Sequence, residues 1–166
     1  MKYSHYLVFV TAMMCLLMSA GNADAQAWQT VNTGTGSTLT EVFFADENTG
    51  WISGAGGLLM RSTNGGTNWA IQNSGTGNVL WALFFIDHNT GWACGNGGTM
   101  LKTTDGGTAW SSQNTGSGVP LWYVHFADPL NGWTSGSGGV ILRTTNGGSS
   151  WQSGSSGTGN TLYSVF

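Results

Sequence analysis

Short runs of alternating apolar and polar residues recur along the chain at a constant spacing. The clearest runs lie at 39–45, 80–86 and 121–127, and another copy starts at 162–166. Alternation over this length is typical of β-strands with one buried face. Because equivalent residues in successive runs are 41 positions apart, as at Leu39, Leu80 and Leu121, the pattern predicts a repeat protein.

Each repeat contains three further β-type runs. A Gly-Trp pair opens the second run, and the third run leads into a nine-residue motif that ends in Trp, after which the fourth run begins. The motif occurs at 61–69 (RSTNGGTNW), 102–110 (KTTDGGTAW) and 143–151 (RTTNGGSSW). Trp28 lies the same distance upstream and predicts a fourth-type strand at 27–33. Four short strands in about 40 residues predict one blade of a β-propeller.

The nine-residue motif has the chemistry of a tight turn between two strands. Its Asn or Asp can accept hydrogen bonds from backbone N–H groups just downstream, and the following Gly pair adopts positive φ without a steric penalty. We therefore assign a structural role to Ser62, Asn64, Gly66, Trp69, Thr103, Asp105, Gly107, Trp110, Thr144, Asn146, Gly148 and Trp151.

The motif S/T-x-D/N-x-G-x-x-W resembles the Asp-box (BNR) repeat of β-propellers. The whole unit, L-x-x-V-x-F-x-D followed by G-W and the Asp box, is similar to the photosystem II stability/assembly factor family over nearly all of residues 27–166. The resemblance implies a propeller that binds and chaperones a protein partner without catalysis. Asn64 and Asn146 depart from the ideal Asp, but a neutral Asn keeps the turn bond.

The predicted fold is all-β, a partial β-propeller of about three four-stranded blades. The repeats span 39–79, 80–120 and 121–161, with a stray strand at 27–33 and a partial blade at 162–166. Three blades do not close a ring, since propellers use at least four. The first hypothesis is therefore a fragment of a larger ring, and the second is self-association through open blade faces.

The first 25 residues have the features of a cleaved signal peptide. Lys2 precedes an apolar run at 6–18, and Ala23-Asp24-Ala25 has the small-x-small form of a cleavage site. We expect a secreted protein, periplasmic or extracellular, with no membrane span after cleavage. Only Cys94 then remains, so no internal disulfide is expected.

The net charge and the pattern of acidic residues argue against nucleic acid and calcium as ligands. The formal net charge is −3, which offers no basic surface for nucleic acid. Asp46, Asp87 and Asp128 recur in one turn per repeat, and we interpret them as Asx turns because the other ligands of a calcium loop are missing. We expect no metal and no cofactor.

Two rows of equivalent residues are candidates for binding. The first strand lines the channel of a propeller, and its second position holds Thr40, then Trp81, Trp122 and Tyr163, with Tyr123 beside them. These aromatic residues fit either packing between blades or a platform for a sugar or for apolar side chains of a partner. The other row is a solvated strand face or a contact for an acidic partner, and it comprises Arg61, Lys102 and Arg143.

The sequence thus favours a secreted, non-catalytic scaffold for a protein partner. The competing hypothesis is a carbohydrate-binding protein or a fragment of a sialidase-like glycoside hydrolase, since Asp boxes also occur there. A sialidase needs three arginines around the substrate carboxylate. Arg61 and Arg143 are the only two arginines in the chain and occupy equivalent positions, so they do not form that triad.

Overall fold

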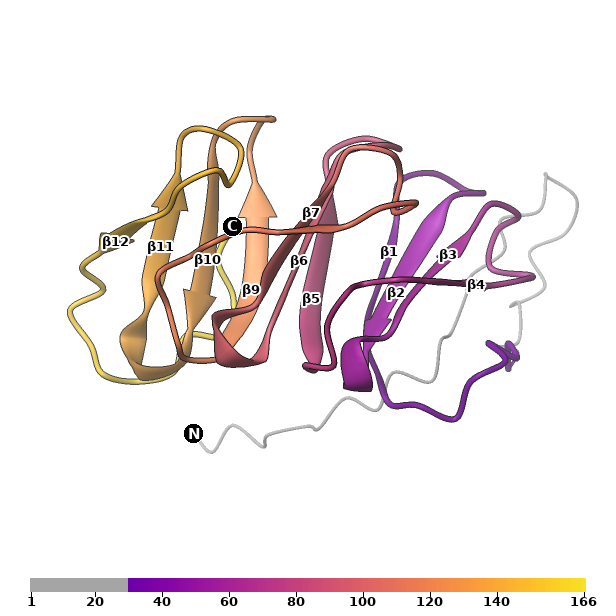
Figure 1. Cartoon of the computed structure of the whole chain (residues 1–166), viewed down its shortest axis with the longest axis horizontal. Helices are drawn as coiled ribbons and strands as arrows, with labels where there is room; N and C mark the ends of the chain where they lie inside the picture. Colours follow the sequence, from indigo (N-terminus) through magenta and orange to yellow (C-terminus); the bar gives the residue numbers. More distant parts are fainter. Residues whose placement is uncertain (1–29) are drawn as a thin grey trace, which may run out of the picture.

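The computed structural model describes residues 30–166, and these residues form three four-stranded antiparallel sheets that lie side by side (Figure 1). In each sheet the strands follow the order of the chain, so every sheet is a meander and constitutes one blade. The first blade contains β1 (Leu39–Phe44), β2 (Gly50–Gly54), β3 (Leu59–Ser62) and β4 (Ala70–Gln72). The second contains β5 (Leu80–Phe85), β6 (Gly91–Gly95), β7 (Met100–Thr103) and β8 (Ser111–Ser112). The third contains β9 (Leu121–Phe126), β10 (Gly132–Gly136), β11 (Ile141–Thr144) and β12 (Gln152–Gly154).

A tight 3-10 turn joins the second and third strands of every blade. The turns are η1 (Ala55–Gly57), η2 (Asn96–Gly98) and η3 (Ser137–Gly139). The third residue of η2, Gly98, has φ 72°, and a Cβ there would lie 1.8 Å from the carbonyl oxygen of Ser117. Only glycine satisfies both the positive φ and the close approach of the linker.

The core lies between neighbouring blades, where the first strand of one blade contacts the first strand of the next. Trp51 of β2 and Trp92 of β6 are 1% and 0% exposed, and each stacks on a phenylalanine of the following blade. These stacked aromatic rings pack with buried aliphatic residues such as Leu80 and Leu121 in the cores between blades.

The ends of the repeat array differ from the sequence prediction. Leu162–Phe166, expected to begin a further blade, forms no strand, and Leu162 is joined to the third blade by one backbone bond to Gly136. A strand needs a neighbour with which to pair, and no described segment pairs with this one. Of the predicted strand at 27–33, Thr30 makes a single β-bridge and residues 31–33 lie in no strand.

Two predictions concern residues outside the described range, namely the signal peptide at 1–25 and the position of Trp28. Within residues 30–166, the structure contains no helix of the length and apolarity that a membrane crossing requires.

Candidate functional site

The Asp-box turn is held by the hydrogen bonds that its residue types make available. In the second blade, Thr103 Oγ1 donates to Asp105 Oδ1 over 2.8 Å and accepts the Gly107 amide over 2.9 Å, while Asp105 Oδ1 also accepts the Ala109 amide. The other two blades repeat this arrangement with Asn64 and Asn146. Neutral Asn therefore makes the same acceptor bonds as Asp105.

The Asp-box turns of the second and third blades also receive the second-strand tryptophan of the preceding blade. Trp51 Nε1 donates to the Gly106 carbonyl over 2.9 Å, and its ring stacks on Phe85 with 3.7 Å between centroids. Trp92 Nε1 donates to the Gly147 carbonyl over 3.2 Å in the same manner. The Asp box is thus both a turn within its own blade and the acceptor at the junction with the previous blade.

The row of basic residues belongs to these junctions. Arg61 lies over the Trp51 ring at 5.7 Å, and Lys102 lies over the Trp92 ring at 5.3 Å. Lys102 Nζ also donates to the Gly147 carbonyl over 2.8 Å, and partial burial lowers the pKa of this amine. The expectation of a solvated strand face therefore requires correction for Arg61 and Lys102, whereas Arg143 is exposed.

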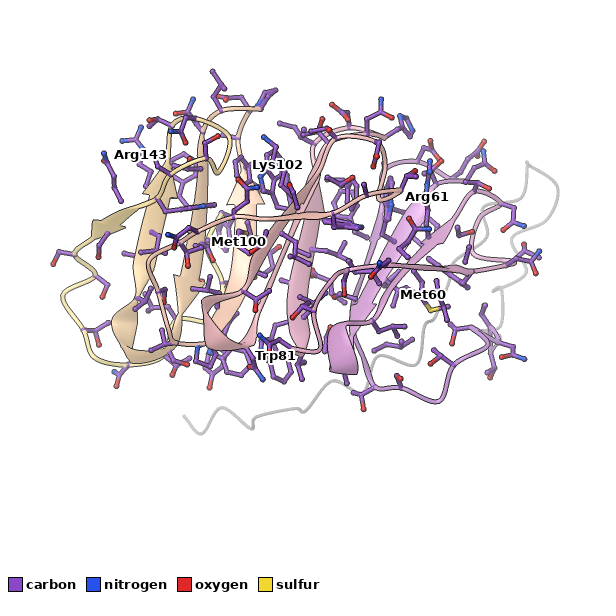
Figure 2. The ribbon with its side chains drawn as sticks, in the orientation of Figure 1. Met60, Arg61, Trp81, Met100, Lys102 and Arg143 are labelled. Atoms are coloured by element: carbon purple, nitrogen blue, oxygen red, sulfur yellow. The ribbon has the colours of Figure 1, made fainter. Side chains whose placement is uncertain are left out.

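The structure brings the predicted aromatic residues together in a row that runs from β5 and β9 to the segment 162–166. The ring centroids of Trp81 and Trp122 are 4.6 Å apart, and those of Trp122 and Tyr163 are 5.5 Å apart. Trp81 Nε1 donates to Asn96 Oδ1 and Trp122 Nε1 to Ser137 Oγ. Tyr163 is 65% exposed. We call Trp81, Trp122 and Tyr163 the aromatic row; Figure 2 shows Trp81 at the opposite end of the blades from the labelled basic residues.

A half-buried carboxyl lies at the contact between the first and second blades. Glu41 accepts the Leu83 amide of the next blade through Oε2 over 2.9 Å, and burial raises the pKa of Glu41 to about 7 against the opposing effect of that bond. Burial raises the pKa of Tyr123, and the nearby carboxylate of Glu41 raises it further. The sequence shows position 41 as variable among repeats, but this contact between blades was not predicted.

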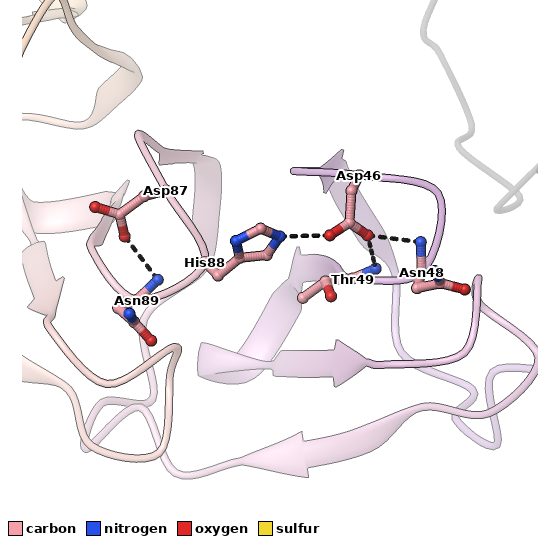
Figure 3. Close-up of polar contacts among 6 residues, drawn as sticks. All are labelled: Asp46, Asn48, Thr49, Asp87, His88 and Asn89. Atoms are coloured by element: carbon pink, nitrogen blue, oxygen red, sulfur yellow. Dashed lines mark hydrogen bonds and ion pairs between the residues drawn. The ribbon is translucent and has the colours of Figure 1, made fainter.

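The recurring aspartates form Asx turns. Asp46 Oδ1 accepts the amides of Asn48 and Thr49, and Asp87 Oδ1 accepts that of Asn89 (Figure 3). Asp128 makes equivalent bonds in the third blade. Asp46 also contacts the His88 ring of the next blade, and this hydrogen bond is the main reason that the pKa of Asp46 falls to about 2. Among residues 30–166, no group of three His, Cys, Asp or Glu residues is placed to hold a metal ion.

A polar groove of about 660 Å³ lies between the linker that follows β4 and the outer side of the second blade. Hydroxyl and amide side chains such as Thr76, Asn78, Thr99 and Gln113 line it, together with the indole of Trp110. No charged side chain is among its lining residues. The groove therefore offers neutral hydrogen-bonding groups and one aromatic edge.

Comparison with known proteins assigns the family. The family model described as photosynthesis system II assembly factor YCF48 matches residues 20–120 and 71–157. The chain belongs to this family. No curated protein matches the chain in sequence.

Solved structures agree with the family assignment. YCF48 bound to D1 peptide is 26% identical with a TM-score of 0.70, covering 78% of this chain and 43% of that one. YCF48 from Cyanidioschyzon merolae is 27% identical with a TM-score of 0.69, covering 77% and 43%. An ancestral GH74 enzyme shares the fold alone. It is 18% identical to this chain with a TM-score of 0.63, and the match covers 75% of this chain and 19% of that enzyme. The prediction of an all-β partial propeller is confirmed, and the chain spans less than half the length of the two YCF48 structures.

Proposed function

We propose that this chain is a non-catalytic protein-binding module of an assembly factor, and that the aromatic row contacts its partner. The observation that carries the proposal is the row itself, in which Trp81, Trp122 and Tyr163 lie next to one another across successive repeats. One of the similar structures is YCF48 bound to D1 peptide, which supports a polypeptide as the partner.

The hydrogen bonds and the spacing of the aromatic row are suited to contact with a partner. The indole N–H groups of Trp81 and Trp122 are satisfied by Asn96 and Ser137, so a partner that covers the rings leaves no indole donor unpaired. The two centroid separations, 4.6 and 5.5 Å, place three rings within the span of about three extended residues at ~3.3 Å each. An extended segment with apolar side chains fits this spacing.

The acidic side chains support a module without catalysis. Asp46, Asp87 and Asp128 accept backbone amides within their own turns, and Asp105 does so within the Asp box. Glu41 is occupied at a junction between blades. Each of these carboxyl groups therefore has a structural role.

The test is to measure, by fluorescence anisotropy, the binding of a set of overlapping peptides that cover D1. We expect at least one peptide to bind, and Trp122→Ala to weaken its binding about tenfold or more, because central aromatic residues dominate such contacts. Ile71→Ala is the control, since Ile71 is 70% exposed on β4, outside the row. Failure of every peptide to bind, or equal binding by the wild type and Trp122→Ala, would refute the proposal.

Carbohydrate binding is a second candidate, favoured by the polar groove and its Trp110 edge. Neutral hydroxyl and amide groups with an aromatic residue are suited to a sugar. A glycan array with the wild type and Gln113→Ala distinguishes this candidate, because Gln113 lines the groove and lies outside the aromatic row. A signal that Gln113→Ala leaves unchanged would remove the groove from consideration.

We also propose that the protein is secreted, supported by the features of residues 1–25. N-terminal sequencing of the protein recovered from the periplasm or the medium is the test. A mature start after Ala25 is the expected result, and retention of Met1 would contradict it.

A further inference from the structure

Glu41 uses only one of its two carboxyl oxygens within the described structure. Its Oε2 accepts the Leu83 amide, which lies on the edge of β5 that is not paired with β6. The first strands of neighbouring blades approach one another at that edge. The other oxygen, Oε1, makes no hydrogen bond to residues 30–166 and is not sealed from solvent. The carboxyl therefore has an acceptor left for a ligand.

No cation of the described residues lies against this carboxyl. The side chains of Arg61, Lys102 and Arg143 each lie over a tryptophan of their own blade. Within residues 30–166, the only ion pair is that of His88 with Asp46. A half-buried carboxylate without a cation carries a desolvation penalty, and this burial raises the pKa of Glu41 to about 7. A cation that arrives with a partner relieves that penalty.

The repeat does not need an acid at this position. The equivalent residues of the following repeats are Ala82, Tyr123 and Ser164. Strands β5 and β9 pack against each other with Ala82 in place of Glu, and Ala82 is 1% exposed. Since the blade forms without the acid, and the ionised acid lowers stability, a role in binding accounts for Glu41 better than a role in folding.

Aromatic residues flank the carboxyl along β5. Trp81 of the aromatic row precedes Leu83 by two residues, about 7 Å along the strand, and Phe84 follows Leu83 directly. The Phe84 ring lies 5.8 Å from that of Phe43, which belongs to the same strand as Glu41. Lysine and arginine cover apolar surface with their aliphatic stems while their charged ends reach a carboxylate. The surroundings of Glu41 suit such a side chain.

We propose that Glu41 binds a lysine or arginine side chain of the polypeptide that occupies the aromatic row, a proposal that rests on the function proposed above. Trp81, Trp122 and Tyr163 contact apolar side chains of that polypeptide, and Glu41 selects a basic residue next to them. The bond is a charge-assisted hydrogen bond from the ammonium or guanidinium group to Oε1. Because the cation needs the ionised carboxylate, binding releases a proton from Glu41 near neutral pH.

The titratable groups around Glu41 leave this proton release measurable. The charge of Glu41 acts on Tyr123 of β9 and on Cys94 of β6. Burial, and then that charge, raises the pKa of both groups, so neither ionises between pH 6 and pH 8. His125 of β9 contacts Phe84, with 4.8 Å between ring centroids, so its titration needs a control. With a pKa of about 7, the ionised fraction of Glu41 rises about tenfold from pH 6 to pH 8.

The experiment uses the D1 peptide that binds most tightly, together with versions in which one lysine or arginine at a time is replaced by norleucine or citrulline. In fluorescence anisotropy, one such replacement should weaken binding to the wild type about tenfold or more and leave binding to Glu41→Gln nearly unchanged. The wild type should bind the parent peptide about tenfold more tightly at pH 8 than at pH 6. Glu41→Gln should lose this pH dependence, which also excludes His125 as its source.

Two variants separate a lost contact from a lost fold. Glu41→Gln keeps an acceptor oxygen for the Leu83 amide, so its circular dichroism should match that of the wild type. Glu47→Gln removes the same charge from an exposed position and should bind like the wild type at every pH.

The outcomes distinguish this inference from the proposed function. If Trp122→Ala loses binding while Glu41→Gln binds like the wild type at every pH, the aromatic row stands and the basic subsite is refuted. If no peptide binds, both are refuted. A tightly bound peptide without lysine or arginine would also overturn the subsite. So would a carboxyl NMR titration that gives Glu41 a pKa of 4.5 or less without peptide, because a cation of the protein itself would then already hold the carboxylate.

Discussion

Glu41 gives the sharpest prediction because its half-buried carboxyl lies at the contact between two blades. Its Oε2 accepts the Leu83 amide, and burial raises its pKa to about 7 from an ordinary value of 4.5. Glu41→Gln retains an acceptor oxygen for that amide and removes the ionisation. We expect this substitution to stabilise the protein at pH 8 and to leave its stability nearly unchanged at pH 4.

The magnitude follows from the two pKa values. Below pH 4.5 the carboxyl is protonated in both the folded and the unfolded chain, so it introduces no penalty. Between 4.5 and about 7 only the unfolded chain releases the proton, and the free energy of unfolding falls as the pH rises. Above pH 7 the loss is complete. The difference between 4.5 and about 7 corresponds to about 3 kcal/mol, at 1.36 kcal/mol per pKa unit.

The assay is urea denaturation of the wild type and Glu41→Gln at intervals from pH 4 to pH 8.5. The difference in free energy of unfolding should grow from near zero to about 3 kcal/mol across that range. Glu47→Gln is the matched control, because Glu47 is exposed and its loss removes the same charge. Wild-type and Glu41→Gln curves that stay parallel from pH 5 to pH 8 would refute the reasoning.

Three further predictions concern packing. Gly98→Ala should lower the free energy of unfolding by about 2 kcal/mol more than Gly116→Ala does. Both glycines have positive φ, but only Gly98 lacks room for a Cβ. Thermal melts of the two variants, run in parallel, check this. Cys94 should react with iodoacetamide only in denaturant, since burial raises the pKa of its thiol; peptide mass spectrometry detects the label. Trp51→Phe should destabilise the protein by about 1 kcal/mol more than Trp92→Phe in urea denaturation. Only in the second case does a neighbouring lysine still donate to the carbonyl that loses its indole partner.

The repeat period predicts the blades because equivalent residues must adopt equivalent structures. The Gly-Trp pairs open β2, β6 and β10 as expected, and the Asp boxes follow β3, β7 and β11. These features depend on local turn chemistry and on alternation within a strand, and a short stretch of sequence determines both.

The contacts between blades could not be predicted in the same way. The period shows that Arg61 and Lys102 are equivalent, but it does not show that each leans over a tryptophan toward the next Asp box. That contact depends on the twist and spacing of neighbouring sheets. The approach of Trp81 to Trp122 and the bond from Leu83 to Glu41 depend on the same spacing.

The contact of each second-strand tryptophan with the phenylalanine and the Asp box of the next blade has a consequence for how such chains change length during evolution. Every complete blade contains one half of a junction on each side, so a tandem duplication of one 41-residue unit supplies both halves of the new contact at once. No compensating substitution is needed elsewhere, since each blade touches only its neighbours. The number of blades can therefore differ among related genes while the residues at the contacts between blades stay the same.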